Sequence, residues 1–393
     1  MATLENLIKE HWIDPKVAAR HAAFHLHMAI LANTPGMTAW RGFILGDAST
    51  IQDLNGQPLF HDFPVLSPEG NPIGTVRASA SRVLGVPVLA TYLGGPRWDL
   101  NKAAIQARAY VERTLKGKVI ATRHVCYAYP KLGIEVKWEE TNGASQRTII
   151  DVGDGSVVSE KVEPGMRGTG VSSFYGGLPE KRVPEAVKRF GVYDSLMKDL
   201  KARSRLELAA HLDLGEFQRA QSVMTELMTP LWTSKVLTFC THGFSHECFR
   251  LHSQPDKGYC VPAACQMILD FWRYYYSIED IALVMKTGTT TIYADEVAGL
   301  KALTCSHFDA QHDSKPTFNK VKGEINANRP FDYSFPLHAT ACAGYKEVRI
   351  KPLGPVPEQS VYLYDPWPSN VGSLRWETYF TWGTDGFVYL RRP

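Results

Sequence analysis

Residues 254–272, QPDKGYCVPAACQMILDFW, place a cysteine at the start of a predicted helix. Pro262 stands two residues after Cys260, and apolar residues follow at helical spacing, at positions 264, 267, 268, 271 and 275. Unpaired backbone donors and the helix dipole stabilise negative sulfur at a helix N-terminus, and a neighbouring imidazolium strengthens the effect. The stretch therefore predicts a nucleophilic cysteine whose pKa is lowered.

The same stretch offers a group that can stabilise a reaction intermediate. Gln254 precedes Cys260 by six residues. Its side-chain amide is predicted to donate a hydrogen bond to the oxyanion that forms when the thiol attacks a carbonyl group. The backbone amide of Cys260 would be the second donor.

A base has to come from another part of the chain, because cysteine nucleophiles and their histidines are usually distant in sequence. The run SFPLHATACAGY, residues 334–345, has strand character and contains His338. A second predicted strand, SVYLYDPWP at 360–368, ends in Asp365, where a carboxylate would orient the His338 ring and stabilise its cation.

The composition limits the class of protein. The 393 residues are 44% hydrophobic, enough for two or three domains, and the net charge of +3 favours neither nucleic acid nor a membrane surface as partner. No run reaches the roughly 18 apolar residues of a membrane span. Seven cysteines, an odd number in a long chain, indicate reduced thiols. We expect a soluble, cytoplasmic protein whose partner is a peptide or amide substrate.

The pattern along the chain predicts an α+β fold in four parts. Residues 1–45 read as helices, with a start signal at Asp14-Pro15. Residues 46–165 alternate short β-branched runs with turn signals around one predicted helix, and form an α+β module. Residues 166–229 are a connector and helical bridge, and 230–393 hold the candidate catalytic residues.

The ordered motifs QPDKGYCVPAACQMILDFW, RPFDYSFPLHATACAGY and VYLYDPWP resemble the papain-like cysteine peptidases, and among them the C39-like group, over about residues 230–393. The resemblance implies a helical half packed on an antiparallel sheet, with no cofactor and no metal ion. It implies Cys260 as nucleophile, His338 as general base and acid, Asp365 as orienting residue and Gln254 in the oxyanion hole. One departure is Val261, where papain has a tryptophan after its cysteine.

Residues 46–165 also resemble the PepSY-like or cystatin-like prodomains that precede some bacterial papain-like peptidases such as streptopain, in phrases such as VCYAYPKLGIEV. Those prodomains inhibit their enzymes. The resemblance implies an intramolecular inhibitory module.

Other histidines and cysteines offer competing interpretations. A zinc site is conceivable in CTHGFSHECFRLH, at Cys240, His242, His246, Cys248 and His252, although alternation in this stretch favours a strand leading to Gln254. His21 and His25 share a helical face but lack a third ligand nearby. Cys265 is predicted to be a packed, inert thiol, and His307 and His312 compete weakly with His338 as base.

Three functions remain open at this point. Hydrolysis of a peptide or amide bond through a Cys260 thioester is favoured. Transfer of the same acyl group to an amine would make the protein an acyltransferase or cyclase. A non-catalytic binding protein with a vestigial site is the third possibility.

Overall fold

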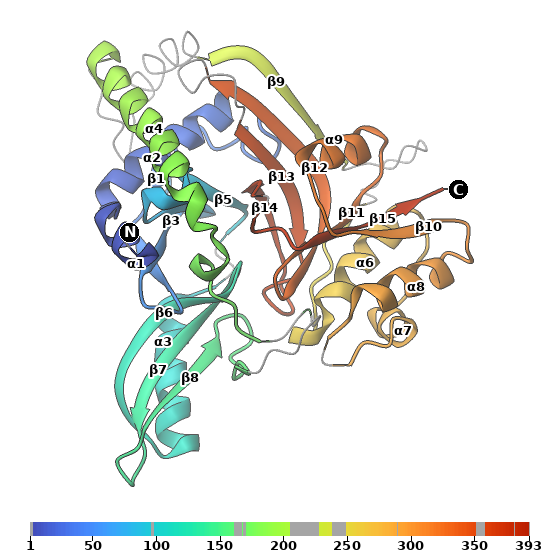
Figure 1. Ribbon diagram of the computed structural model, residues 1–393, viewed down its shortest axis with the longest axis horizontal. Helices are drawn as coiled ribbons and strands as arrows, with labels where there is room; N and C mark the ends of the chain where they lie inside the picture. Colours follow the sequence, from blue (N-terminus) through green and yellow to red (C-terminus); the bar gives the residue numbers. More distant parts are fainter. Residues whose placement is uncertain are drawn as a thin grey trace.

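The computed structural model describes residues 3–95, 98–160, 167, 170–204, 228–237, 249–288, 290–350, 358–380 and 382–392 (Figure 1). Helices and strands are both abundant in this part of the chain, which confirms the predicted α+β class. The described helices are α1 Leu4–Glu10, α2 Pro15–Leu31, α3 Leu100–Tyr110, α4 Val183–Ser204, α6 Cys260–Phe271, α7 Ile278–Val284, α8 Tyr293–Leu303 and α9 Phe318–Asn326. The described strands are β1 Ile44–Leu45, β2 Ser49–Asp53, β3 Pro58–Leu66, β4 Pro72–Ser79, β5 Val88–Leu93, β6 Lys118–Ala128, β7 Lys131–Glu139, β8 Ser145–Asp151, β9 Met228–Val236, β10 Asp309–Asp313, β11 Phe331–Phe335, β12 His338–Ile350, β13 Glu358–Asp365, β14 Ser373–Thr378 and β15 Gly386–Arg391.

Capping residues fix the two N-terminal helices. The Thr3 side chain accepts a hydrogen bond at the start of α1. At the start of α2 the Asp14 side chain accepts the Lys16 amide hydrogen at 2.8 Å, with Pro15 in the first turn, as the sequence predicts. Most of α2 is buried, and it packs on β3, β4 and β5.

One sheet runs through both halves of the chain: the N-terminal half, which carries β1 to β8, and the C-terminal half, which carries β9 to β15. Most of its described strands follow the order β10-β15-β11-β12-β13-β14-β5-β4-β3-β2-β6-β7-β8, and off this path β1 pairs with β3 and β9 with β12. The two halves meet where β14 pairs with β5 in antiparallel fashion, from Leu374 opposite Leu93 to Glu377 opposite Ala90. The N-terminal half is therefore hydrogen-bonded to the strands that carry the candidate site. The domain boundaries stay a prediction.

The run 125–140 holds the end of β6 and the whole of β7, which are joined by a tight turn. β6 and β7 pair from Lys118 opposite Glu139 to Ala128 opposite Lys131, so Tyr129 and Pro130 form the turn. β8 continues the sheet, and α3, capped by Asp99, covers β6 and β7 (Figure 1). The turn itself points toward the C-terminal half.

The C-terminal half places a buried helix against the sheet. α6 begins at Cys260, as predicted, and packs on β11 and β12, with α7 and α8 beside it (Figure 1). β12 pairs with β13 along one edge, while its other edge pairs first with β11 and, from Gly344 on, with β9.

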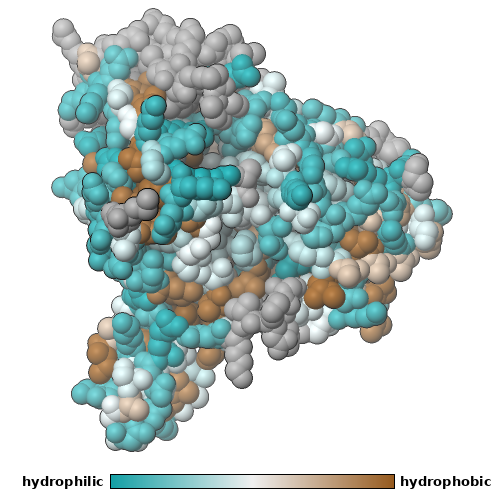
Figure 2. Space-filling model, in the orientation of Figure 1, coloured by the Kyte–Doolittle hydropathy of each residue, from teal (hydrophilic) through white to brown (hydrophobic). Residues whose placement is uncertain are grey.

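The molecular surface seen in Figure 2 is mostly hydrophilic. Hydrophobic residues gather at its lower right, in the region of α7, where Leu283 and Val284 are exposed. In the part of the chain that the structure describes, no helix combines the length and the apolar character needed to cross a membrane.

Candidate active site

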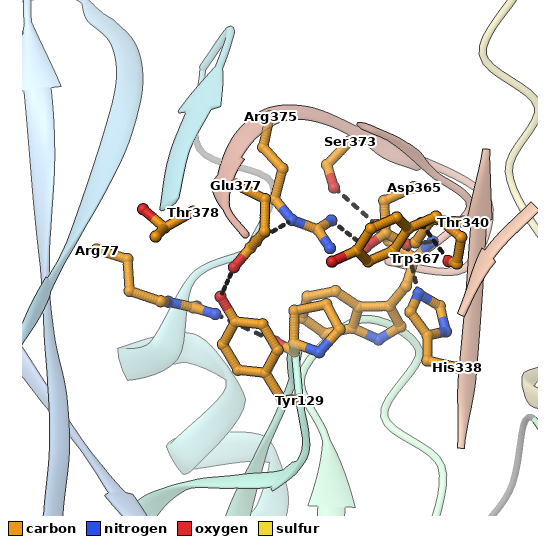
Figure 3. A network of polar contacts seen from close by, with 12 residues as sticks. Arg77, Tyr129, His338, Thr340, Asp365, Trp367, Ser373, Arg375, Glu377 and Thr378 are labelled. Carbon is orange, nitrogen blue, oxygen red and sulfur yellow. Dashed lines mark hydrogen bonds and ion pairs between the residues drawn. The ribbon is translucent and has the colours of Figure 1, made fainter. Parts of the chain in front are cut away.

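His338 and Asp365 meet in the core of the sheet. His338 is the first residue of β12 and Asp365 is the last residue of the neighbouring strand β13. His338 Nε2 lies 2.6 Å from Asp365 Oδ1, and both residues are fully buried (Figure 3). The backbone amide of Trp367 also donates to Asp365 Oδ1, at 2.8 Å. The structure thus brings together the histidine and the carboxylate that the sequence pairs.

Cys260 lies beside this pair. Its sulfur, at the N-terminus of α6, lies near the backbone amide of Ala339, the residue after His338, and this amide favours the thiolate and so lowers the thiol pKa. His338 Nδ1 is buried and has no hydrogen-bond partner among the described residues. Because Asp365 occupies Nε2, the ring nitrogen that remains is the one available to a thiol.

The predicted low thiol pKa is wrong for this conformation. Burial raises the pKa of Cys260, and the positive charge of Lys131 opposes that rise without reversing it. Burial also lowers the pKa of His338 to about 4, against the opposing effect of Asp365. Removing both groups from water disfavours their charged forms more strongly than the helix N-terminus and the carboxylate favour them. The site therefore holds a neutral thiol and a neutral imidazole.

Gln254 is fully buried next to the loop that follows Asp365. Its backbone amide donates to Pro366 O at 3.0 Å and its carbonyl accepts from the Asn370 amide at 2.9 Å. Its side-chain Nε2 makes a long hydrogen bond of 3.4 Å to Ser369, and Oε1 has no partner among the described residues. The backbone therefore holds Gln254 in place, whereas its side chain makes a single long hydrogen bond among the described residues.

Lys131 is a site residue that the sequence analysis missed. It comes from the start of β7 in the N-terminal half, is 1% exposed, and donates from Nζ to Leu337 O at 3.0 Å. Burial lowers its pKa, and the charges of Cys260 and Asp365 are among those that oppose the change. A lysine directly after a Tyr-Pro turn between two strands is the only sequence signal, and it does not say where the turn docks.

Arg375 was also missed. Its Nη1 donates to Asp365 Oδ2 and its Nε donates to Glu377 Oε2 at 2.7 Å (Figure 3). Burial would raise the pKa of Asp365, but His338 and Arg375 outweigh it and lower that pKa to about 2. The alternation in SLRWET, residues 373–378, puts Arg375 and Glu377 on one face of a strand, which is a signal that sequence reading can detect.

The N-terminal half covers the site. Lys257, which precedes Cys260, donates from Nζ to the carbonyls of Ser156 and Val157 at 3.2 and 3.1 Å. Trp367 Nε1 donates to Asp151 Oδ2 at 3.1 Å. Together with the β6–β7 turn, these contacts leave the side chains of the four predicted catalytic residues without solvent exposure: Gln254, Cys260, His338 and Asp365.

The competing candidates lie elsewhere. His307 Nδ1 is 2.9 Å from the Tyr274 hydroxyl, and the His312 ring stacks on Tyr293 at 3.8 Å. Cys265 is buried against Glu296, and burial raises its pKa.

The zinc hypothesis falls mostly outside the described residues. Of its five residues only His252 is described, and its Nε2 lies 2.7 Å from Asp270 Oδ2. The other four are Cys240, His242, His246 and Cys248. On α2, His21 Nε2 lies 3.0 Å from Asp194 Oδ1, so this histidine is engaged by a carboxylate.

Residues 247–388 match the model of the Peptidase_C39 like family. No curated protein matches the chain. Among solved structures, it is similar to the peptidase domain of Streptococcus ComA, a bi-functional ABC transporter involved in a quorum sensing pathway, with 18% identity and a TM-score of 0.29 over 37% of this chain and 99% of that one. The family match confirms the resemblance of the motifs, whereas the PepSY-like resemblance of residues 46–165 stays a prediction. Residues 247–388 therefore belong to the Peptidase_C39 like family, within the papain-like cysteine peptidases.

Proposed function

We propose that the chain hydrolyses a peptide or amide bond through a thioester on Cys260. The sulfur attacks the carbonyl carbon, and the thiol proton passes to His338 Nδ1. The Gln254 side-chain amide and the Cys260 backbone amide stabilise the oxyanion. His338 then protonates the departing amine, the C–N bond breaks, and water activated by the neutral imidazole releases the acid and restores the thiol.

The observation that carries this proposal is the arrangement of the His338 ring. Asp365 Oδ1 accepts a hydrogen bond from His338 Nε2 at 2.6 Å, while His338 Nδ1 has no partner among the described residues. The Cys260 sulfur lies near the backbone amide of Ala339, the next residue along the chain. A buried ring nitrogen without a hydrogen-bond partner destabilises the fold, so its presence calls for a functional explanation. Proton exchange with the thiol is such an explanation.

We also propose that the described conformation is a resting form, held closed by the N-terminal half. The support is that the four residues of the proposed machinery have no exposure, and that the β6–β7 turn, the end of β8 and the loop after β8 make the contacts that enclose them. A peptide substrate needs this cover to move before it can reach the sulfur.

Alkylation with iodoacetamide tests whether the thiol and the imidazole act together. Peptide mapping by mass spectrometry follows Cys260 over a range of pH, with the exposed Cys305 as an internal reference. We expect His338→Ala to slow the alkylation of Cys260 and leave Cys305 unchanged, and Cys265→Ala to alter neither. If His338→Ala leaves the Cys260 profile identical, the site is vestigial and the binding-protein alternative is favoured.

Transfer to an amine shares the first half of the reaction. Incubation of the protein with N-acetylglycine phenyl ester, with and without glycinamide, separates the two outcomes. Hydrolysis predicts N-acetylglycine under both conditions, and an acyltransferase predicts the glycinamide adduct. In either case the product has to disappear in Cys260→Ala.

A further inference from the structure

A chain of buried polar groups connects Asp365 to the N-terminal half. Arg375 donates to Asp365 through Nη1 and to Glu377 through Nε, the latter at 2.7 Å. Glu377 in turn accepts a hydrogen bond from the hydroxyl of Tyr129, which lies in the β6–β7 turn (Figure 3). Asp365, Arg375 and Glu377 have no exposure and Tyr129 is 5% exposed.

The strand register explains how this connection arises. β14 lies between β13, which carries Asp365, and β5 of the N-terminal half. Arg375 and Glu377 are two residues apart on β14 and therefore project from the same face. One side chain of this face reaches the site and the other reaches the turn.

The turn is held from a second direction as well. Arg77 makes a two-point ion pair with Asp62, at 2.8 and 2.9 Å, and its Nη1 lies 3.4 Å from the carbonyl oxygen of Pro130. The guanidinium also lies 5.7 Å from the centre of the Tyr129 ring. The Tyr129 hydroxyl is thus directed at Glu377 by a buried charge pair on the N-terminal side.

The charges of Arg375 and Glu377 affect the hydrogen bond between His338 and Asp365. Arg375 occupies Asp365 Oδ2, so its positive charge competes with the imidazole for the same carboxylate. Glu377 offsets that positive charge, and the Tyr129 hydroxyl favours the ionised form of Glu377 against the effect of burial. In a water-free site, a change at one end of such a network is felt at the other.

We infer that Arg375 is a positioning residue for Asp365, and that Tyr129 of the N-terminal half controls the strength of the His338–Asp365 hydrogen bond through Glu377 and Arg375. This inference rests on the proposed function, in which that bond orients the base. The guanidinium fork fixes Asp365 so that Oδ1 faces the ring. Docking of the turn is thereby coupled to the electrostatics of the site.

The proton in the His338–Asp365 hydrogen bond gives a direct measurement. In the full chain with ¹⁵N-labelled histidine and Cys260→Ala, its low-field NMR resonance is recorded at pH 7 and assigned by its loss in His338→Gln. Arg375→Gln frees the full charge of Asp365 for the ring, so we expect a downfield shift. In Glu377→Gln and Tyr129→Phe, less negative charge offsets Arg375, so Arg375 competes more strongly with His338 for Asp365. We therefore expect upfield shifts in both variants, with the smaller shift in Tyr129→Phe.

Opposite signs separate this inference from a general loss of structure, which would move all three variants alike. Tyr175→Phe removes another buried hydroxyl, one that donates to Pro58 O at 2.8 Å, and is the control that leaves the resonance in place. An unchanged resonance in Tyr129→Phe and Glu377→Gln overturns the inference even if Arg375→Gln does not fold. The measurement involves no turnover, so its failure is distinct from a failure of the proposed function, which the alkylation of Cys260 decides.

Discussion

Lys131 Nζ donates a hydrogen bond to the carbonyl oxygen of Leu337 at 3.0 Å, across 206 residues of sequence. Leu337 immediately precedes His338, so an ammonium group of the N-terminal half lies at the edge of the candidate site. Its charge acts on Cys260, Asp151 and Asp365. This contact joins the start of β7, directly after the covering turn, to the edge of the site.

Lys131→Glu is expected to open the site. The substitution removes the donor to Leu337 O and places a carboxylate near Asp151 and Asp365. Loss of a charged hydrogen bond costs about 1.5–3 kcal/mol, so the open fraction should rise roughly tenfold or more. Iodoacetamide should then modify Cys260 faster at neutral pH, with a profile moved to lower pH because burial no longer raises the thiol pKa.

Lys137→Glu is the matched control for this change. It lies on the same strand with an exposed side chain, and should leave the alkylation profile unchanged. A closed site with an added negative charge would behave in the opposite way and move the Cys260 profile of Lys131→Glu to higher pH. That result would contradict the assignment of the turn as the cover.

Gln254→Ala should separate activity from stability. Both backbone hydrogen bonds of residue 254 survive the substitution, and the side chain makes only the 3.4 Å contact to Ser369 among the described residues. We expect kcat on the phenyl ester, measured in a Lys131→Glu background, to fall about 100-fold or more. The melting temperature should barely change. A Gln254→Ala enzyme with undiminished kcat would remove this residue from the oxyanion hole.

Acid should destabilise the folded chain well before its carboxylates are protonated. Burial lowers the pKa values of His27 and His338 from 6.5 to about 4. The unfolded chain therefore binds protons that the folded chain does not, and stability is lost as the pH falls from 6.5 toward 4. Each imidazole contributes on the order of 3 kcal/mol to that loss. Asp365, with a pKa of about 2, adds to it only at lower pH.

Urea unfolding at pH 7, 5.5 and 4.5 measures this dependence. His27→Gln removes one of the two groups without touching the site, and its free energy of unfolding should fall less steeply with pH. Equal free energies at pH 7 and 4.5 in the parent chain would show that the two imidazoles are already protonated in the fold.

Arg167→Met should be strongly destabilising. Its guanidinium is buried, donates to Asp332 Oδ2 at 3.0 Å and to Glu296, and reaches the carbonyl of Thr291 at 3.2 Å. Removing it leaves two carboxylates in the core, which typically costs about 3–5 kcal/mol.

The comparison for Arg167→Met is Lys301→Met. The Lys301–Asp309 pair has a similar distance of 2.8 Å, but both side chains are 40% exposed or more, so solvent screens the pair and its loss should cost much less than the loss of Arg167. Equal losses in the two variants, measured by urea unfolding, would contradict the assignment of Arg167 as a structural anchor.

The local features of this protein could be predicted from its amino-acid sequence. The spacing of apolar residues after Pro262 predicts α6 and its start at Cys260, and the order of Gln254, Cys260, His338 and Asp365 predicts the C39-like resemblance, which the family match over residues 247–388 confirms. These features depend on neighbours along the chain, where helical periodicity, proline and strand alternation are legible. The pairing of His338 with Asp365 could also be predicted, because adjacent antiparallel strands place the start of one beside the end of the other.

The surroundings of the Cys260 sulfur, in contrast, depend on how distant parts of the chain pack together. The predicted low pKa of Cys260 failed because burial, a property of the whole fold, outweighed the local helix terminus. Lys131 and Tyr129 reach the site because β14 pairs with β5 and the β6–β7 turn docks beside it, and no local pattern specifies such a register. Desolvation and long-range electrostatic effects depend on which parts of the chain are in contact in the folded protein, and these contacts cannot be read from local sequence patterns.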